Sequence, residues 1–219
     1  MKSNQNYKNA ALAALKGRWA SAIVASIIFC GAVWAFSVPC MLSSFAVQGL
    51  LQIDLNVCVA MQLIYCLGML LIVAPLTIGC SNAFLRLLRE GHGNVSQNLA
   101  SYAFNGYWRN IWGAFLTRFF IFLWSLLLII PGLVKNYSYA LTPYLLKEFP
   151  ELSANQCINL SKKMMKGHKF DLFFLHLSFI GWIILAVLSA GIGLFGLVPY
   201  IEASEAAFYQ EVKTEYFKS

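Results

Sequence analysis

Charged side chains are scarce in this sequence. Asp, Glu, Lys and Arg make up 11% of its 219 residues, whereas hydrophobic residues make up 59%. A soluble domain usually carries about 25% charged residues, and a small soluble domain leaves a large part of its surface in water. A chain of this composition could not cover its apolar surface by folding alone. The composition therefore argues against an ordinary soluble protein and predicts a membrane protein.

The missing charge is concentrated in three long gaps. No Asp, Glu, Lys or Arg occurs between Arg18 and Asp54, between Asp54 and Arg86, or between Asp171 and Glu202. A helix that spans a bilayer needs about 20 mostly apolar residues. Each of the first two gaps holds one span, and the third holds one span and the start of another. We therefore predict an all-α, polytopic membrane protein.

Enzyme and metal-site motifs are also absent. The sequence contains no H-E-x-x-H, no G-x-S-x-G and no Walker-type glycine loop. No second His or Cys stands at ligand spacing from His176, and Ser178 is two residues away, on a different face of a helix. We expect no catalytic residue, no cofactor and no metal. An intramembrane enzyme is the disfavoured alternative.

The six cysteines include no C-x-x-C pair. Most of them fall in apolar runs, where cysteine behaves as a small hydrophobe. Cys40 and Cys58 flank the predicted external loop, so a disulfide between them is geometrically conceivable, and the sequence leaves this open. The N-terminus lacks a short apolar core followed by a small-residue cleavage site, so we expect no cleaved signal peptide.

The formal charge of +7 does not indicate nucleic-acid binding, because no RNA- or DNA-binding motif accompanies it. Of the 16 Lys and Arg residues, all except Arg118 and Lys135 fall in the termini or in the loops after the second and fourth predicted spans. The loop over residues 48–56 has none. By the positive-inside rule both termini are predicted to be cytoplasmic.

Six spans are predicted within a single membrane domain over residues 1–219. Their approximate limits are 20–45, 58–85, 111–130, 133–146, 170–189 and 194–209, and the fourth is short for a full crossing.

The spans are expected to form three helical hairpins that repeat one pattern. Each unit has an amphipathic helix, a glycine, a span, a break and a proline-containing span, over about 4–91, 92–148 and 149–214. Gly17, Gly106 and Gly167 open the units. Kinks or turns are expected at Pro75, at Pro131 with Gly132, and at Pro199.

Short amphipathic helices are predicted at the membrane surface. Residues 4–16 place Tyr7, Ala11, Leu12 and Leu15 on one face, and a weaker example lies near residue 99. The clearest lies within residues 148–169, where Ser153-x-x-Gln156 is a capping-box signature. Its basic side chains suit a bilayer surface with anionic lipid headgroups. They are Lys162, Lys163, Lys166, His168 and Lys169.

Ionisable residues at membrane depth are costly and are functional candidates by default. The predicted intramembrane polar cluster comprises Arg118, Lys135, Tyr139, His176, Glu202 and Glu205. We expect Lys135 to pair with Glu202, and Glu205 to bond Arg118 or His176. The alternative is that these groups only hold the bundle together, as many buried polar contacts between membrane helices do.

Three segments resemble a known family. They are Ile130-Pro131-Gly132 with Tyr137-Ser138-Tyr139, the run from Ser161 to Lys169, and Ser178-Phe179-Ile180-Gly181-Trp182. The sequence is similar to bacterial polytopic proteins grouped as domain of unknown function 975. The resemblance implies a multi-span protein of a bacterial inner membrane and brings no activity or catalytic residue with it.

The predicted function is therefore that of an integral inner-membrane protein which binds or moves an amphiphile, or assists a transport or envelope system. Broken helices and midplane charges are typical of transporters. The alternative is a scaffold or accessory subunit with a membrane-protein partner.

Overall fold

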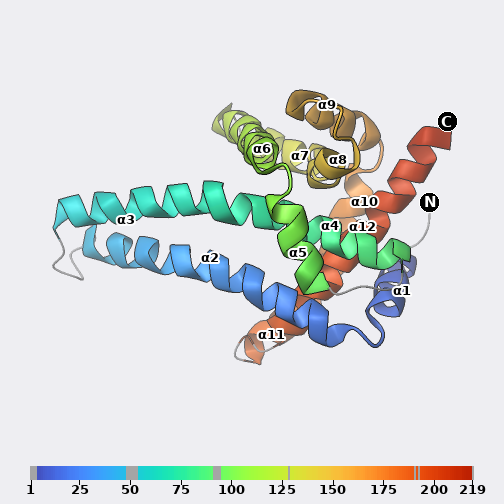
Figure 1. The fold of residues 1–219 in the computed structure, drawn as a ribbon, viewed down its shortest axis with the longest axis horizontal. Helices are drawn as coiled ribbons and strands as arrows, with labels where there is room; N and C mark the ends of the chain where they lie inside the picture. The colour runs from blue at the N-terminus through green and yellow to red at the C-terminus, as the bar shows by residue number, and fades with distance from the viewer. Residues whose placement is uncertain are drawn as a thin grey trace.

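The computed structural model describes residues 4–47, 54–90, 95–127, 129–189, 191 and 193–218. All regular structure in these residues is helical, which confirms the predicted all-α class. Figure 1 shows long helices extending to the left, away from a group of shorter helices on the right.

The N-terminal part contains the long arm (Figure 1). This part comprises α1 (Asn4–Leu15), α2 (Trp19–Val47), α3 (Leu55–Gly68), a π-helical turn η1 (Met69–Val73) and α4 (Ala74–Glu90). Helices α2 and α3 form the arm and lie side by side along it (Figure 1). Most of the predicted loop over residues 48–56 lies outside the described residues. Pro39 lies inside α2, where no proline had been singled out.

The π-helical turn directly precedes Pro75, at the place where a kink is predicted. Proline cannot donate to the carbonyl four residues earlier, which here belongs to Leu71. The Tyr107 hydroxyl donates to that carbonyl oxygen over 2.7 Å. A neighbouring helix thus satisfies the freed acceptor, as is required at membrane depth.

The middle part comprises α5 (Val95–Phe104), α6 (Tyr107–Leu127), α7 (Ile129–Ser138) and α8 (Thr142–Glu148). Two predictions are wrong here. The chain does not turn at Pro131 and Gly132, because both lie within α7; proline is tolerated in a first helical turn, where its missing N–H is not needed. The fourth predicted span is interrupted after Ser138, and α8 starts afresh with Pro143 in its first turn.

The C-terminal part comprises α9 (Ala154–Met164), α10 (Lys169–Leu177), α11 (Ile180–Leu188) and α12 (Leu194–Lys218). The predicted capping box is present: the Gln156 N–H donates to Ser153 Oγ, and the Ser153 N–H donates to Gln156 Oε1. Pro199 lies inside the continuous helix α12.

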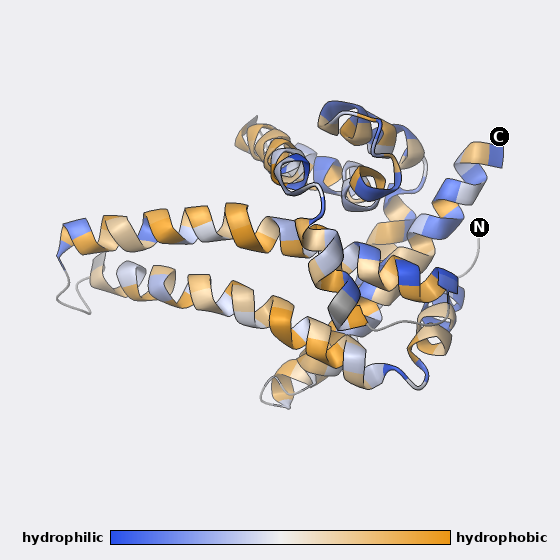
Figure 2. Ribbon diagram, viewed as in Figure 1, coloured by the Kyte–Doolittle hydropathy of each residue, from blue (hydrophilic) through white to orange (hydrophobic). Residues whose placement is uncertain are grey.

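Three helical stretches in the described residues are long and apolar enough to cross a membrane. They are Trp19–Ala46, Leu55–Glu90 and Lys169–Leu188. Figure 2 shows hydrophobic residues along the arm of α2 and α3, and many hydrophilic residues towards the C-terminal end of α12. The length and apolar character of these three helices support the prediction of a membrane protein.

The shorter helices pack in a regular order. Helix α5 packs on α4, α9 packs on α8, and α1 packs on α12, the last helix of the chain. The glycine after each of these short helices has a left-handed backbone conformation, with φ of 77° at Gly17, 66° at Gly106 and 96° at Gly167. This conformation is easily accessible only to glycine. All three predicted glycines therefore perform the same local task, ending one helix and redirecting the chain into the next.

The buried face of α1 differs from the predicted one. Tyr7, Ala11 and Leu15 are buried as expected, but Leu12 is exposed and Lys8 is buried. The Lys8 ammonium donates to the carbonyl oxygen of Ser178 over 3.0 Å and lies 4.3 Å from the ring centroid of Phe179. These contacts compensate its burial. The cysteines of the described residues are all free, Cys40 and Cys58 included.

Candidate functional site

Part of the predicted polar cluster assembles where α4, α7, α10 and α12 approach one another. His176 Nε2 on α10 lies 2.8 Å from Glu205 Oε1 on α12, one of the two pairings expected for Glu205. The Tyr137 ring is 5.8 Å from the His176 ring. Glu202 accepts a 3.4 Å hydrogen bond from the Ser81 hydroxyl of α4.

Lys135 does not join this cluster. Its Nζ lies 4.2 Å from the ring centroid of Trp124 on the neighbouring helix α6. The expected ion pair between Lys135 and Glu202 is therefore not formed in the described residues. The lysine stem is long enough to carry its charge to an aromatic face, where the ring quadrupole attracts the cation.

Arg118 and Tyr139 also lie apart from His176 and Glu205, in a cavity that we call the lateral groove. This groove of about 500 Å³ lies between α4, α6, α7 and α8. Its polar lining residues are Thr77, Thr117, Arg118, Ser125, Asn136, Tyr139 and Thr142, and its apolar ones include Ala114, Ile121, Phe122 and Leu146. A mixed lining of this kind, in a cavity of this size, is typical of small-molecule sites.

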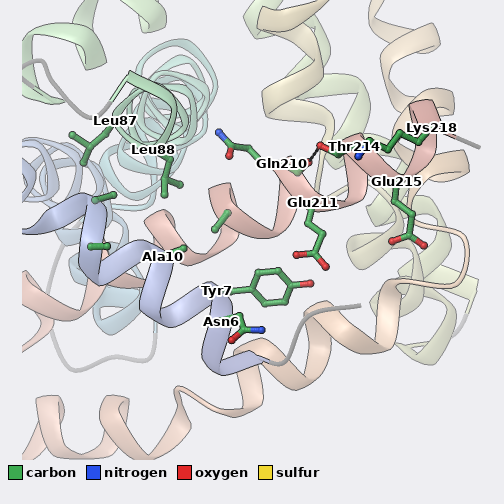
Figure 3. A pocket seen from close by; sticks show the side chains of 13 residues that line it. Asn6, Tyr7, Ala10, Leu87, Leu88, Gln210, Glu211, Thr214, Glu215 and Lys218 are labelled. Atoms are coloured by element: carbon green, nitrogen blue, oxygen red, sulfur yellow. Dashed lines mark hydrogen bonds between the residues drawn. The ribbon is translucent and has the colours of Figure 1, made fainter.

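A second groove, of about 710 Å³, lies at the hydrophilic end of the molecule between α1 and α12. Figure 3 shows its two walls, with Tyr7 pointing from α1 towards Glu211 on α12. Leu87 and Leu88 of α4 line it with apolar surface, and Glu215 adds a second carboxylate.

An ionic cluster that the sequence interpretation missed joins the ends of α4, α8 and α12. The Glu148 side chain, only 15% exposed, lies 2.7 Å from Arg89 Nη2. The same carboxylate accepts hydrogen bonds from the Lys213 ammonium and the Tyr209 hydroxyl. The Tyr209 ring stacks on Tyr144 at 4.6 Å. The Glu148 carboxylate of α8 thus contacts both α4 and α12.

The surroundings of Glu148 also shift the pKa of its carboxyl group. Burial by itself raises the pKa of this carboxyl, but the bonds from Lys213, Tyr209 and Arg89 outweigh burial and bring the pKa below its ordinary value. Next to it, burial and the charge of Arg109 lower the pKa of Lys147 to about 8. The Lys147 ammonium donates to the carbonyl oxygen of Asn105.

A sequence signal for the Glu148 cluster existed. Leu87-Leu88-Arg89-Glu90 and Leu145-Leu146-Lys147-Glu148 are similar sequences, and each stands at the C-terminal end of a helix, α4 and α8. The two glutamates have different partners: Glu90 pairs with Arg86 one turn earlier in the same helix, whereas Glu148 pairs with Arg89 of another helix. No pattern in the sequence indicated that Thr142 and Asn136 line the same groove as Arg118.

The basic residues predicted for α9 and the turn after it lie outside the apolar core. Lys162, Lys163 and Lys166 are exposed, whereas Met164 and Met165 are buried on the other face. His168 lies within 3.6 Å of Asp171 and 3.8 Å of Glu215. Lys169 is the first residue of α10. The predicted amphipathic character is therefore confirmed.

Comparison with known proteins gives a family match for the C-terminal part of the chain. No curated protein and no solved structure matches the chain. Residues 126–216, from the end of α6 to near the end of α12, match the family described as "Protein of unknown function (DUF975)", and the resemblance noted in the sequence is confirmed over this region.

Proposed function

We propose that this chain is a non-enzymatic protein of a bacterial inner membrane that holds or moves an amphiphile in the lateral groove. The observation that carries the proposal is the groove itself. It combines an apolar wall from α6 with hydroxyl, amide and guanidinium groups at one site. An amphiphile has the same two chemical parts, a hydrocarbon tail and a polar head.

The proposed topology has six spans in three hairpins, with α2 and α3, α6 and α7, and α10–α11 with α12 as the paired segments. The equivalent left-handed glycines support an internal repeat, and so does the order in which each short helix packs. The packing of α1 on α12 joins the first unit to the third and suggests a closed ring of three units.

The proposed orientation places the short helices and both termini in the cytoplasm. The N- and C-terminal helices lie together at the hydrophilic end (Figures 1 and 2). The exposed lysines of α9 lie among these short helices, and basic residues there would meet anionic lipid headgroups of the cytoplasmic leaflet.

The groove can be tested by filling it. Ala114 on α6 lines the groove, whereas Ala35 on α2 is exposed on an apolar arm. The wild type, Ala114→Phe and the matched control Ala35→Phe would be released from native-lipid nanodiscs and their bound lipid measured by native mass spectrometry. Ala140→Leu, which alters the opposite wall with a smaller side chain, serves as a second groove variant if Ala114→Phe fails to fold.

We expect a defined adduct on the wild type and on Ala35→Phe, and its loss from a folded groove variant. A wild type without any adduct would refute the amphiphile proposal and favour the scaffold alternative. An adduct that survives both groove variants would refute the placement in this groove.

A further inference from the structure

We propose that the lateral groove selects an amphiphile with an anionic headgroup, such as a phosphate, and that the Arg118 guanidinium binds this anion. This inference rests on the proposed function, because it assumes that the groove holds an amphiphile. Beyond the proposed function, it specifies the charge of the ligand and the residue that binds that charge.

The charge of the groove is the first argument. Among the described residues that line it, Arg118 alone is charged, and its side chain is exposed. No carboxylate of the described residues lies within ion-pair distance of Arg118. Glu202 and Glu205, the carboxylates of the predicted cluster, bond Ser81 and His176 instead. An arginine inside a membrane needs an anion or another acceptor, so a ligand anion would complete the site.

Hydrogen-bond donors on the opposite wall are the second argument. The Thr142 hydroxyl is fully buried and has no hydrogen-bond partner in the described part of the chain. An unbonded buried hydroxyl is unfavourable. Asn136 and Tyr139 line the same wall with an amide and a phenol. A phosphate offers several acceptor oxygens, and guanidinium binds it with charge-assisted hydrogen bonds.

The other hydroxyls of the groove do not compete for this role. Each donates to a carbonyl oxygen of its own helix four residues earlier: Thr77 to Val73, Thr117 to Gly113, and Ser125 to Ile121. Their donors are used, so the side-chain donors left for a ligand are those of Arg118 on α6 and those of the opposite wall.

The apolar lining distinguishes a lipid from a free anion. Ile121 and Phe122 follow Arg118 by about one turn of α6, and Phe122 is 62% exposed. An acyl chain bound along α6 would cover this surface while its headgroup meets Arg118. A soluble phosphate would leave it uncovered, and it would not need a cavity of about 500 Å³.

The test uses the full-length protein in nanodiscs of phosphatidylcholine with a minor fraction of phosphatidylglycerol of the same chains. Native mass spectrometry gives the ratio of the two lipids among the bound adducts. Arg118→Gln removes the charge, Arg118→Lys keeps it with a different shape, and Lys162→Gln removes an exposed charge from α9 as the matched control. A further arm adds inorganic phosphate.

We expect the wild type to enrich phosphatidylglycerol about tenfold over its mole fraction, since an arginine–phosphate contact is a strong charge-assisted bond. Arg118→Gln should abolish the enrichment, Arg118→Lys should keep part of it, and Lys162→Gln should leave it unchanged. Added phosphate should not displace the lipid, because it cannot replace the acyl-chain contacts.

Two results would overturn the inference and leave the proposed function standing: a bound lipid with no preference for phosphatidylglycerol, or a preference that Arg118→Gln does not alter. Displacement of the lipid by inorganic phosphate would assign the site to a soluble anion and so overturn the lipid assignment. The absence of any bound lipid would refute the proposed function itself.

Discussion

Neutralising Glu148 tests whether the ionic cluster holds α4, α8 and α12 together. In Glu148→Gln the side chain keeps its size but loses the charge that Arg89 and Lys213 share. Removing one partner of a fully buried ion pair costs about 3–5 kcal/mol. Arg89 and Lys213 are 40% and 27% exposed, so water would solvate them partly. We therefore expect a loss of about 2–3 kcal/mol in the free energy of unfolding.

The loss should lower the unfolding temperature in detergent by roughly 5–10 °C. A thiol-reactive dye can report unfolding, because Cys80 and Cys157 are buried and react only when the helices separate. Glu151→Gln is the matched control, since Glu151 is an exposed acid three residues along the chain. If the two variants unfold within about 0.5 kcal/mol of each other, the cluster does not stabilise the fold.

The stability difference between the wild type and Glu148→Gln should depend on pH. The pKa of Glu148 is lowered in the folded protein, so its carboxylate adds stability above the ordinary carboxyl pKa of about 4.3, and this contribution disappears as the pH falls through the folded value. The difference between the wild type and Glu148→Gln should be largest near neutral pH and vanish in acid. A difference that persists in acid would mean that the charge is not its cause.

Two further predictions concern neighbouring parts of the same region. A Cβ on Gly79 would lie 2.5 Å from the Leu99 carbonyl oxygen of α5, so Gly79→Ala should force α4 from α5 and cost about 1–3 kcal/mol. Gly181→Ala, with nothing within 4 Å, should unfold like the wild type, and equal effects of both changes would contradict the close approach. Because the pKa of Lys147 is lowered to about 8, the folded protein loses this proton before the unfolded chain does, and stability should rise between about pH 8 and 10.5. The unfolding temperature of the wild type should therefore increase relative to Lys147→Gln from pH 7.5 to 9.5, and a constant difference would rule out this titration.

Local features of the fold were predictable from the sequence. The capping box at Ser153 and the left-handed turns at Gly17, Gly106 and Gly167 follow from residue type and spacing over a few positions. These features depend on contacts within one or two helical turns. A kink was predicted at Pro75 from the proline alone, and the structure has a π-helical turn, η1, shortly before it.

Contacts between helices were predicted less well. His176 and Glu205 pair as expected, whereas Lys135 and Glu202, which follow Pro131 and Pro199 at similar distances in the sequence, do not. Depth gives the height of a residue in a bundle and not the direction in which it faces. Lys135 faces Trp124 because α7 turns back along α6, and the turn falls before Pro131 and Gly132.

The sequence by itself determined the class of the protein, because charge and hydropathy are sums over residues and do not depend on which helices meet. It also marked Arg118 as an unusual charge. Only the tertiary structure decided that Arg118 shares a groove with Thr142, and that Glu148 binds Arg89 and Lys213. Those neighbours come from different helices, and their proximity depends on how α4, α6, α8 and α12 pack against one another.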